Sequence, residues 1–182
     1  MTIKSLFTLL FVALLAITTR SQSKTLVTYF SHSGNTKVVA EYIQDMTGAD
    51  IFRIEPADEY PQDYKTLCDQ AKKEINEHYY PNLKNSIESI ASYDTIFVGT
   101  PNWWNTMAPP VATFLTLYNF DGKVIIPFCT HGGGGKGHIF EDMTNLCPNS
   151  EFKEGYSVNG DLVNDCKSDV KKWLKKVTSS DN

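Results

Sequence analysis

The chain has 182 residues, which corresponds to one domain of ordinary size. Hydrophobic residues make up 41% of it and charged residues 21%, a composition typical of globular proteins and not of disordered or fibrous ones. Seventeen basic residues stand against 21 acidic ones, and no basic block is present, which argues against nucleic-acid binding. Only Arg20 and Arg53 are arginines, so a bound phosphate would have to be held by backbone amides or lysine.

Residues 1–23 have the features of a signal peptide. Lys4 supplies a positive charge, and the apolar stretch 6–17 is shorter than the ~20 residues that cross a membrane. Small residues precede the boundary between Ser23 and Lys24, where we expect cleavage. The sequence therefore predicts an exported protein, periplasmic or secreted, with no membrane association after cleavage. A retained anchor and a buried N-terminal helix are the alternatives.

Strand and helix patterns alternate from residue 24 to the C-terminus. Runs rich in β-branched and aromatic residues predict five strands, over residues 25–30, 50–54, 95–98, 123–128 and 152–158. Helical spacing of apolar residues predicts helices between Gly34 and Gly48, over residues 66–78, from Pro109 onward, over Ile139–Leu146 and over residues 162–177. Such alternation forms parallel βαβ units with right-handed crossovers. The predicted fold is an α/β doubly wound three-layer sandwich, formed by residues 24–182 as one domain.

The four cysteines are expected to be mostly free, buried thiols. They are Cys68, Cys129, Cys147 and Cys166. Export permits disulfides, but free cysteine also packs readily as a small hydrophobic residue. Cys147 ends a helix that returns to the amino edge of the sheet, whereas Cys166 follows a strand that has reached the carboxyl edge, so we expect no bond between them. No C-x-x-C pair is present, and the sequence gives no support for a metal site.

The loop after the first strand is small, uncharged and rich in hydroxyl groups. It contains Ser31, His32, Ser33, Gly34, Asn35 and Thr36. In an open parallel sheet, ligands bind beyond the carboxyl ends of the strands. Backbone N–H groups at the start of the next helix, together with the hydroxyls of Ser31, Ser33 and Thr36, would bind a phosphate there. An ordinary turn in which Ser33 caps the helix is the alternative.

The loop after the third strand contains two adjacent tryptophans. It begins with Pro101, Asn102, Trp103, Trp104, Asn105 and Thr106. Two adjacent tryptophans that follow a buried strand cannot both face a core, so at least one is exposed or stacked on a planar group. The short, uncharged polar neighbours suit contacts to a heteroaromatic ring. A surface for a protein partner is the alternative.

The loop after the fourth strand is saturated with glycine. It contains Thr130, His131, Gly132, Gly133, Gly134 and Gly135, followed by Lys136 and Gly137. Glycine lets the backbone approach a ligand closely in any conformation. The run satisfies G-x-G-x-x-G through its composition alone, so it is a weak sign of a dinucleotide site. Taken together, the three loops predict a site for a phosphate attached to a planar ring.

Three other readings fit the residues less well or stay open. A phosphatase of this architecture needs a cysteine followed six residues later by arginine, and no such pair exists. A serine hydrolase acting through Ser31 or Ser33 would lack the G-x-S-x-G motif and would leave the tryptophan pair unexplained. An exported, non-redox binding module remains an alternative.

Residues 27–36 resemble the phosphate loop of the flavodoxin family. The segments 100–111 and 127–137 are similar to the two isoalloxazine-contacting loops of that family, and they follow in the same order. Thr28 departs from the family pattern, which has an apolar or aromatic residue there. The resemblance covers the chain from Thr25 onward and implies a sheet of order 2-1-3-4-5 that binds FMN without a covalent link.

By this resemblance, Ser31, Ser33, Gly34, Asn35 and Thr36 would hold the phosphate of FMN. Residues 101–106 would flank one face of the ring, with Trp103 or, by a slight preference, Trp104 stacked on it. Residues 130–135 would wrap the other side. The flavin performs the redox chemistry, so no catalytic residue is assigned.

The resemblance implies two roles, electron carrier and FMN-dependent reductase of small acceptors such as quinones. Carrier flavodoxins generally surround the flavin with acidic residues, whereas the three loops contain no Asp or Glu. Rim charge governs encounter with a partner more than affinity. The sequence leaves the redox donor and acceptor, and therefore the choice between carrier and enzyme, open.

Overall fold

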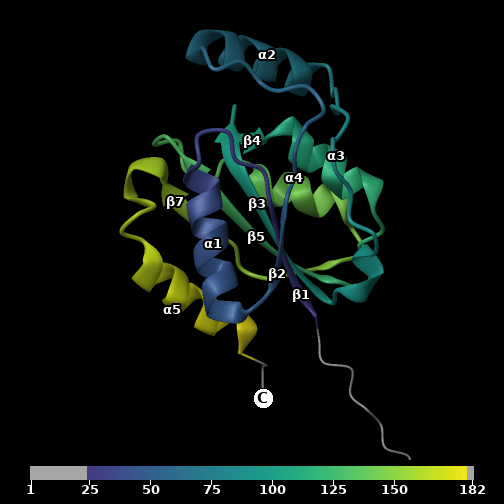
Figure 1. Ribbon diagram of the computed structural model, residues 1–182, viewed down its shortest axis with the longest axis vertical. Coiled ribbons are helices and arrows are strands. Elements are labelled where there is room, and N and C mark those ends of the chain that lie inside the picture. Colours follow the sequence, from purple (N-terminus) through teal and green to yellow (C-terminus); the bar gives the residue numbers. More distant parts are fainter. Residues whose placement is uncertain (1–23, 180–182) are drawn as a thin grey trace, which may run out of the picture.

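The computed structural model describes residues 24–179, and its centre is a parallel sheet of order β2-β1-β3-β5-β6 (Figure 1). The parallel strands are β1 (Thr25–Tyr29), β2 (Asp50–Arg53), β3 (Thr95–Trp103), β5 (Val124–His131), β6 (Glu151–Phe152) and β7 (Tyr156–Asn159). The helices are α1 (Asn35–Thr47), α2 (Tyr64–Asn76), α3 (Pro109–Leu117), α4 (Ile139–Leu146) and α5 (Lys167–Thr178), with short 3-10 turns at Ile90–Ser92 and Gly160–Leu162. The predicted signal peptide lies outside the described residues.

Helices cover both faces of the sheet, which confirms the predicted three-layer sandwich. Successive side chains of a strand point to opposite faces, and Leu26 and Val27 of β1 are accordingly buried in two different hydrophobic clusters. The cluster around Leu26 packs against α3 and α4, and the cluster around Val27 packs against α1 and α5. In β3, Ile96 likewise belongs to the first cluster and Phe97 to the second. This two-sided burial explains the continuous apolar runs of the central strands.

The segment after the third strand is a hairpin, which differs from the loop that the sequence predicts. Strand β3 continues to Trp103, and β4 (Thr106–Met107) pairs with it in antiparallel fashion. The two residues between them, Trp104 and Asn105, have φ values of 53° and 68°. Positive φ at both central residues defines the two-residue turn that matches the twist of a hairpin. The turn therefore leaves Trp103 at the end of β3 and places Trp104 in the turn itself.

The predicted last strand, 152–158, is divided in two. Strand β6 pairs with β5 as far as Ile125, and β7 resumes the pairing at Phe128. Pro127 lies within this gap and has no N–H to donate to a neighbouring strand. Gly155 lies in the break, where a Cβ would stand 2.4 Å from the ring of Phe140. The interruption thus follows from a proline in one strand and a tight contact in the other.

The loop of residues 31–36 joins α1 through glycine. Gly34 precedes the helix with a φ of 94°, and no side chain caps this end. Because Gly34 occupies the cap position and no side-chain hydrogen bond caps the helix, Ser33 is not the helix cap that the alternative reading requires. At the other end, Gly48 adopts a left-handed conformation and donates its N–H to the carbonyl of Gln44, which confirms the predicted helix end.

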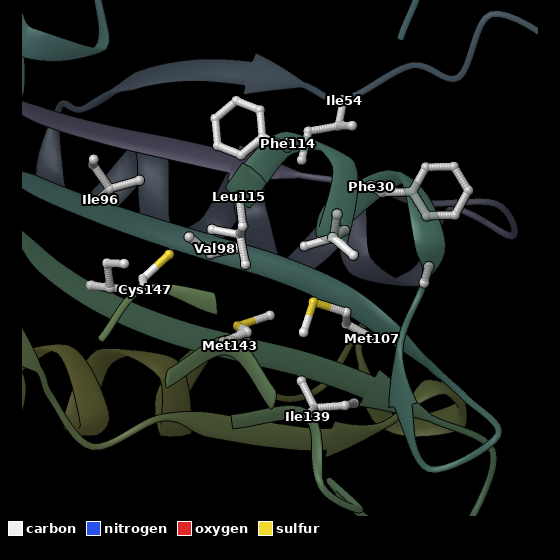
Figure 2. Packing of buried hydrophobic residues seen from close by; sticks show 14 of the residues in the cluster. Phe30, Ile54, Ile96, Val98, Met107, Phe114, Leu115, Ile139, Met143 and Cys147 are labelled. Carbon is white, nitrogen blue, oxygen red and sulfur yellow. The ribbon is translucent and has the colours of Figure 1, made fainter. Parts of the chain in front are cut away.

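All four cysteines are free thiols, and three of them are buried. Burial raises the pKa of Cys129 and of Cys147 to about 11 each, which makes both thiols unreactive near neutral pH. Cys147 belongs to the cluster beneath α3 and α4 (Figure 2), whereas Cys166 belongs to the cluster on the other face of the sheet. The sheet therefore separates Cys147 from Cys166.

We expect no disulfide between Cys147 and Cys166, even after oxidative treatment of the folded protein. The physical reason is the sheet that lies between them, because a disulfide needs Cα atoms within ~7 Å of each other. Peptide mapping without reducing agent measures this directly. A linked peptide pair containing both cysteines would contradict the topology as well as the prediction.

Within residues 24–179, no helix has the length and apolar character needed to span a membrane. The same part of the chain holds no cluster of three or more His, Cys, Asp or Glu side chains arranged to bind a metal ion.

Candidate functional site

The three sequence-predicted loops meet at the carboxyl edge of the sheet. The first and third are joined by a buried hydrogen bond of 2.8 Å between the hydroxyls of Thr36 and Thr130. Thr36 lies in the first turn of α1, and Thr130 lies near the end of β5, 94 residues further along the chain. Parallel pairing makes this meeting necessary, since the strands before these loops end at the same edge.

The second and third loops are held together by two hydrogen bonds. The side-chain amide of Asn102 donates to the carbonyl of Gly135 at 2.6 Å, and the N–H of His138 donates to the carbonyl of Asn105 at 2.7 Å. Gly137 permits the second contact, because a Cβ at this position would stand 2.3 Å from the carbonyl oxygen of Asn105. Each of the two asparagines thus positions the glycine-rich segment against the hairpin.

The hydroxyl groups of the first loop differ in their surroundings. The Oγ atom of Ser31 is buried and has no hydrogen-bond partner in the part of the chain that the structure describes. A buried hydroxyl without a partner is costly, which marks this atom as one that a ligand would satisfy. Ser33 is exposed, and Thr36 is already engaged with Thr130. Next to them, the first N–H groups of α1 have no partner inside the helix.

The glycine-rich loop leaves open space beside the backbone. Gly133 and Gly135 have φ values of 112° and 67°, and a Cβ at either position, or at Gly132, would meet nothing within 4 Å. The N–H of Gly133 donates to Nδ1 of His131, which holds that imidazole against its own loop. Because glycine is needed here for conformation and not for packing within the protein, a ligand can approach the backbone closely.

A family comparison decides the class of protein. The family model described as Flavodoxin matches residues 24–177. The chain belongs to the flavodoxin family. The match spans nearly all residues that the structure describes and includes all three loops, so the resemblance drawn from their motifs is confirmed.

Solved structures of three bacterial proteins are similar to this flavodoxin. A Bacteroides eggerthii protein assigned as a flavoprotein is 29% identical, with a TM-score of 0.77 over 87% of this chain and 100% of its own. A similarly assigned protein from Bacteroides uniformis is 30% identical, with a TM-score of 0.75 over 84% and 98% of the two chains. A Lactobacillus acidophilus flavoprotein, solved in complex with FMN, is 23% identical, with a TM-score of 0.65 over 79% and 98%. No curated protein sequence matches the chain.

Trp103 of this flavodoxin faces the first loop. Its ring lies 6.3 Å from that of His32, between ring centroids, and packs edge-on against Phe30 at 5.4 Å. Tyr60 closes the cluster, 4.9 Å from Trp103. This packing leaves Trp103 half-buried, with part of its ring available to a ligand.

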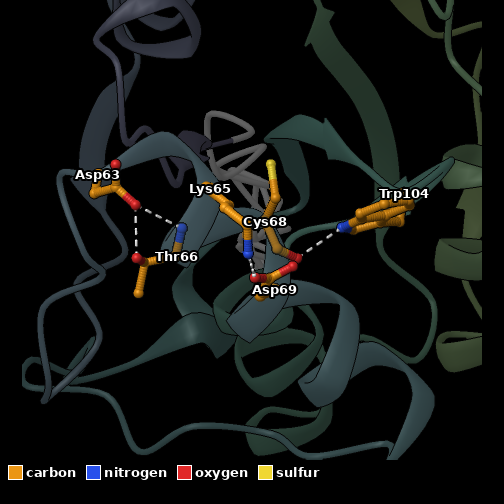
Figure 3. A network of polar contacts seen from close by, with 6 residues as sticks. All are labelled: Asp63, Lys65, Thr66, Cys68, Asp69 and Trp104. Atoms are coloured by element: carbon orange, nitrogen blue, oxygen red, sulfur yellow. Dashed lines mark hydrogen bonds and ion pairs between the residues drawn. The ribbon is translucent and has the colours of Figure 1, made fainter.

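Trp104 points the other way, toward α2 (Figure 3). Its indole N–H donates to the carbonyl of Cys68 at 3.0 Å, and the ammonium of Lys72 lies 4.7 Å from the ring centroid. The side chain is 50% exposed. The structure therefore places Trp103, and not Trp104, beside the first loop, whereas the sequence slightly favoured Trp104 for stacking on a ligand ring.

Two parts of this edge carry no motif and were missed in the sequence. Tyr60 comes from the segment between β2 and α2, and its hydroxyl donates to Glu74 at 2.6 Å. Burial and this hydrogen bond raise the pKa of Tyr60, so the phenol stays protonated. Gly160 follows β7 and leaves room for the side chain of Asn35, whose amide nitrogen would stand 2.3 Å from a Cβ there. For Gly160, the only signal in the sequence was a glycine two residues after the predicted strand 152–158.

Proposed function

We propose that this flavodoxin binds FMN non-covalently at the meeting point of the three loops and uses it as a redox cofactor. The observation that carries the proposal is the buried, unpartnered hydroxyl of Ser31 beside the free amides that begin α1. The residues present fit one phosphate group, because hydroxyl and amide donors converge there. The FMN complex of the Lactobacillus acidophilus relative supports the same reading.

In this proposal each loop has its own task. Ser31, Ser33 and Thr36 donate hydroxyls to the phosphate, with Gly34 and Asn35 shaping the turn that presents the amides. Trp103 and the backbone of residues 101–106 flank one side of the ring. The backbone of residues 130–135 flanks the other side and excludes water. FMN, when bound, accepts and passes on electrons, and the protein contributes binding, orientation and electrostatics.

We expect the purified protein to bind FMN in preference to FAD. The site offers one cluster of phosphate donors, and Arg53 is the only arginine after residue 23 that could serve a second phosphate. The test is to release the bound cofactor by heat and separate it chromatographically, together with titration of the flavin-free protein with FMN, FAD and riboflavin. Recovery of mostly FAD, or a protein without visible flavin absorption that fails to bind FMN, would overturn the proposal. The second outcome is the one expected of a serine hydrolase or a non-redox binding module.

We expect Trp103→Ala to weaken FMN binding by roughly tenfold or more, since a stacked base on an aromatic side chain contributes ~1–3 kcal/mol. Trp104→Ala is the matched control, because that ring is held by α2 on the other side of the hairpin. Fluorescence titration measures both affinities, and the quenching of flavin emission on binding should be weaker in the Trp103 variant than in the Trp104 variant. A larger loss of FMN affinity in the Trp104 variant would mean that Trp104 stacks on the ring, as the sequence slightly preferred.

We further propose that the flavin serves a small acceptor or donor, with electron carriage to a protein partner as the second candidate. The three loops present no acidic side chain and instead hold His32, His131 and Lys136, which does not suit docking of a cationic carrier protein. Screening NADH and NADPH as donors, with quinones as acceptors, tests the first role. Turnover only in the presence of a redox protein would favour the second.

We also propose that residues 1–23 direct export. Mass spectrometry of the protein recovered from the exported fraction measures the mature N-terminus, which we expect at Lys24. Recovery of the intact chain from the cytoplasm would contradict this proposal.

A further inference from the structure

A separate cavity lies beside the hairpin, on the side away from the phosphate loop. Its volume is about 400 Å³, and its walls come from α2, the β3–β4 hairpin, α3 and α4. Small-molecule sites commonly measure ~300–1,000 Å³. No residue of 31–36 or 130–135 lines it, so it meets the proposed flavin site only at Trp104, Asn105 and Thr106.

The strained backbone of the protein gathers around this cavity. Among residues 24–179, the non-glycine residues with positive φ are His78, Trp104 and Asn105, and all three line it. Asparagine tolerates this conformation, but a bulky tryptophan there is a genuine outlier. The hairpin turn imposes this conformation on Trp104 and Asn105, so both residues hold a fixed position in the wall of the cavity.

Three aromatic rings line the cavity while remaining open to solvent. Tyr79, Tyr80 and Trp104 are 51%, 42% and 50% exposed. The face of an aromatic ring is negatively polarised and attracts cations, tryptophan most strongly. The ammonium of Lys72, 4.7 Å from the ring centre of Trp104, shows that this ring already accepts a cation.

Two carboxylates in the lining have no cationic partner. Glu74 is only 8% exposed and accepts hydrogen bonds from the neutral side chains of Tyr60 and Gln70. Asp142 accepts one from the hydroxyl of Thr106. Neither forms an ion pair with any residue that the structure describes.

The rest of the lining does not neutralise these charges. It contains no lysine or arginine, and its basic side chains, His78 and His138, are positively charged only when protonated. Glu74 is buried and its hydrogen bonds come from neutral groups, which offset only part of the desolvation cost of a carboxylate. A positively charged ligand would offset it.

We propose that this cavity binds a small organic cation. Its charged nitrogen, a protonated amine or a quaternary ammonium, faces Glu74 and Asp142, and its apolar body packs against Tyr79, Tyr80 and Trp104. The cavity contains none of residues 31–36 or 130–135 and shares only Trp104, Asn105 and Thr106 with the second loop, so the inference does not depend on FMN.

The test is calorimetric titration of the full-length protein, with and without added FMN, using three probes of the same shape. Naphthylmethylamine carries a positive charge at neutral pH, naphthylmethanol is neutral, and naphthoate is negative. We expect the amine to bind at least tenfold more tightly than the alcohol, and naphthoate not to bind, whether or not FMN is present. Equal affinity for amine and alcohol would show a site for neutral aromatic ligands and would overturn the proposal, as would the absence of saturable binding.

Variants separate a local charge effect from a general one. Asp142→Asn keeps a hydrogen-bond acceptor for Thr106. It should lower the affinity for the amine at least fivefold and leave the affinity for the alcohol unchanged. Glu141→Gln is the matched control, because it also removes one negative charge, at the neighbouring residue, which does not line the cavity. An equal loss in both variants would contradict the proposed contact.

Filling the cavity provides a second line of evidence. Ala112→Leu extends a buried side chain of α3 into the space, and Asn145→Trp does the same from an exposed position on α4, where folding is at less risk. At least one of these variants should have the Tm of the wild-type protein and yet fail to bind the amine. Undiminished binding in a folded, filled variant would place the amine elsewhere and overturn the assignment.

Discussion

The double variant Ser31→Ala, Ser33→Ala should bind FMN at least a hundredfold more weakly than the wild-type protein. Each hydrogen bond to a charged group contributes ~1.5–3 kcal/mol, and 1.4 kcal/mol corresponds to about tenfold in affinity. The affinity for riboflavin, which lacks the phosphate, should fall much less. Thr36 is a less informative target than its place in the motif indicates, because its hydroxyl also joins two loops through Thr130.

Stability distinguishes a ligand-binding hydroxyl from a structural one. Ser31→Ala removes a buried hydroxyl that has no partner, so the flavin-free protein should unfold at the same temperature or a higher one. Thr28→Val is the matched control, because Thr28 carries the other buried, unpartnered hydroxyl but lies within β1. This control should also keep or raise stability, yet leave FMN affinity unchanged. Equal losses of FMN and riboflavin in the double variant would mean that the loop does not bind the phosphate.

Gly137→Ala should lower the free energy of unfolding by about 2–4 kcal/mol. The residue has a φ of 52°, which costs an alanine ~1–2 kcal/mol, and the new Cβ would collide with the carbonyl of Asn105. For a domain of this size the shift in Tm is on the order of 10 °C. Because the collision pushes the hairpin away from the glycine-rich loop, FMN affinity should fall as well.

Gly132→Ala is the matched control for this change. It lies in the same run, has no positive φ, and its added Cβ would meet nothing within 4 Å of the protein. The flavin-free variant should therefore keep its Tm, while FMN affinity reports how closely the cofactor approaches that position. Thermal unfolding of both flavin-free variants measures the two Tm values. Similar Tm values for the two would show that the contact between Gly137 and Asn105 is dispensable.

The sequence by itself was sufficient for the fold class and for bringing the three loops to one edge of the sheet. The alternation of strand and helix patterns predicted a sheet covered on both faces, and the clusters around Leu26 and Val27 show this two-sided burial directly. Parallel strands all end at one edge, so the order of the elements alone required the loops containing Thr36, Asn102 and Thr130 to meet. Gly48 ended its helix as expected, since a left-handed helix cap is a local property of glycine.

Only the tertiary structure decided which way the two tryptophans point. The hairpin turn places Trp103 toward His32 and Trp104 toward Cys68, and the second contact joins residues 36 positions apart. No local pattern encodes such a contact, because it depends on where α2 lies beyond the carboxyl edge of the sheet (Figure 1). The same is true of Tyr60, which has no motif of its own and enters the site through long-range packing. Backbone conformation is read from neighbouring residues, whereas the direction of a side chain at the end of a strand is set by distant segments that pack against it.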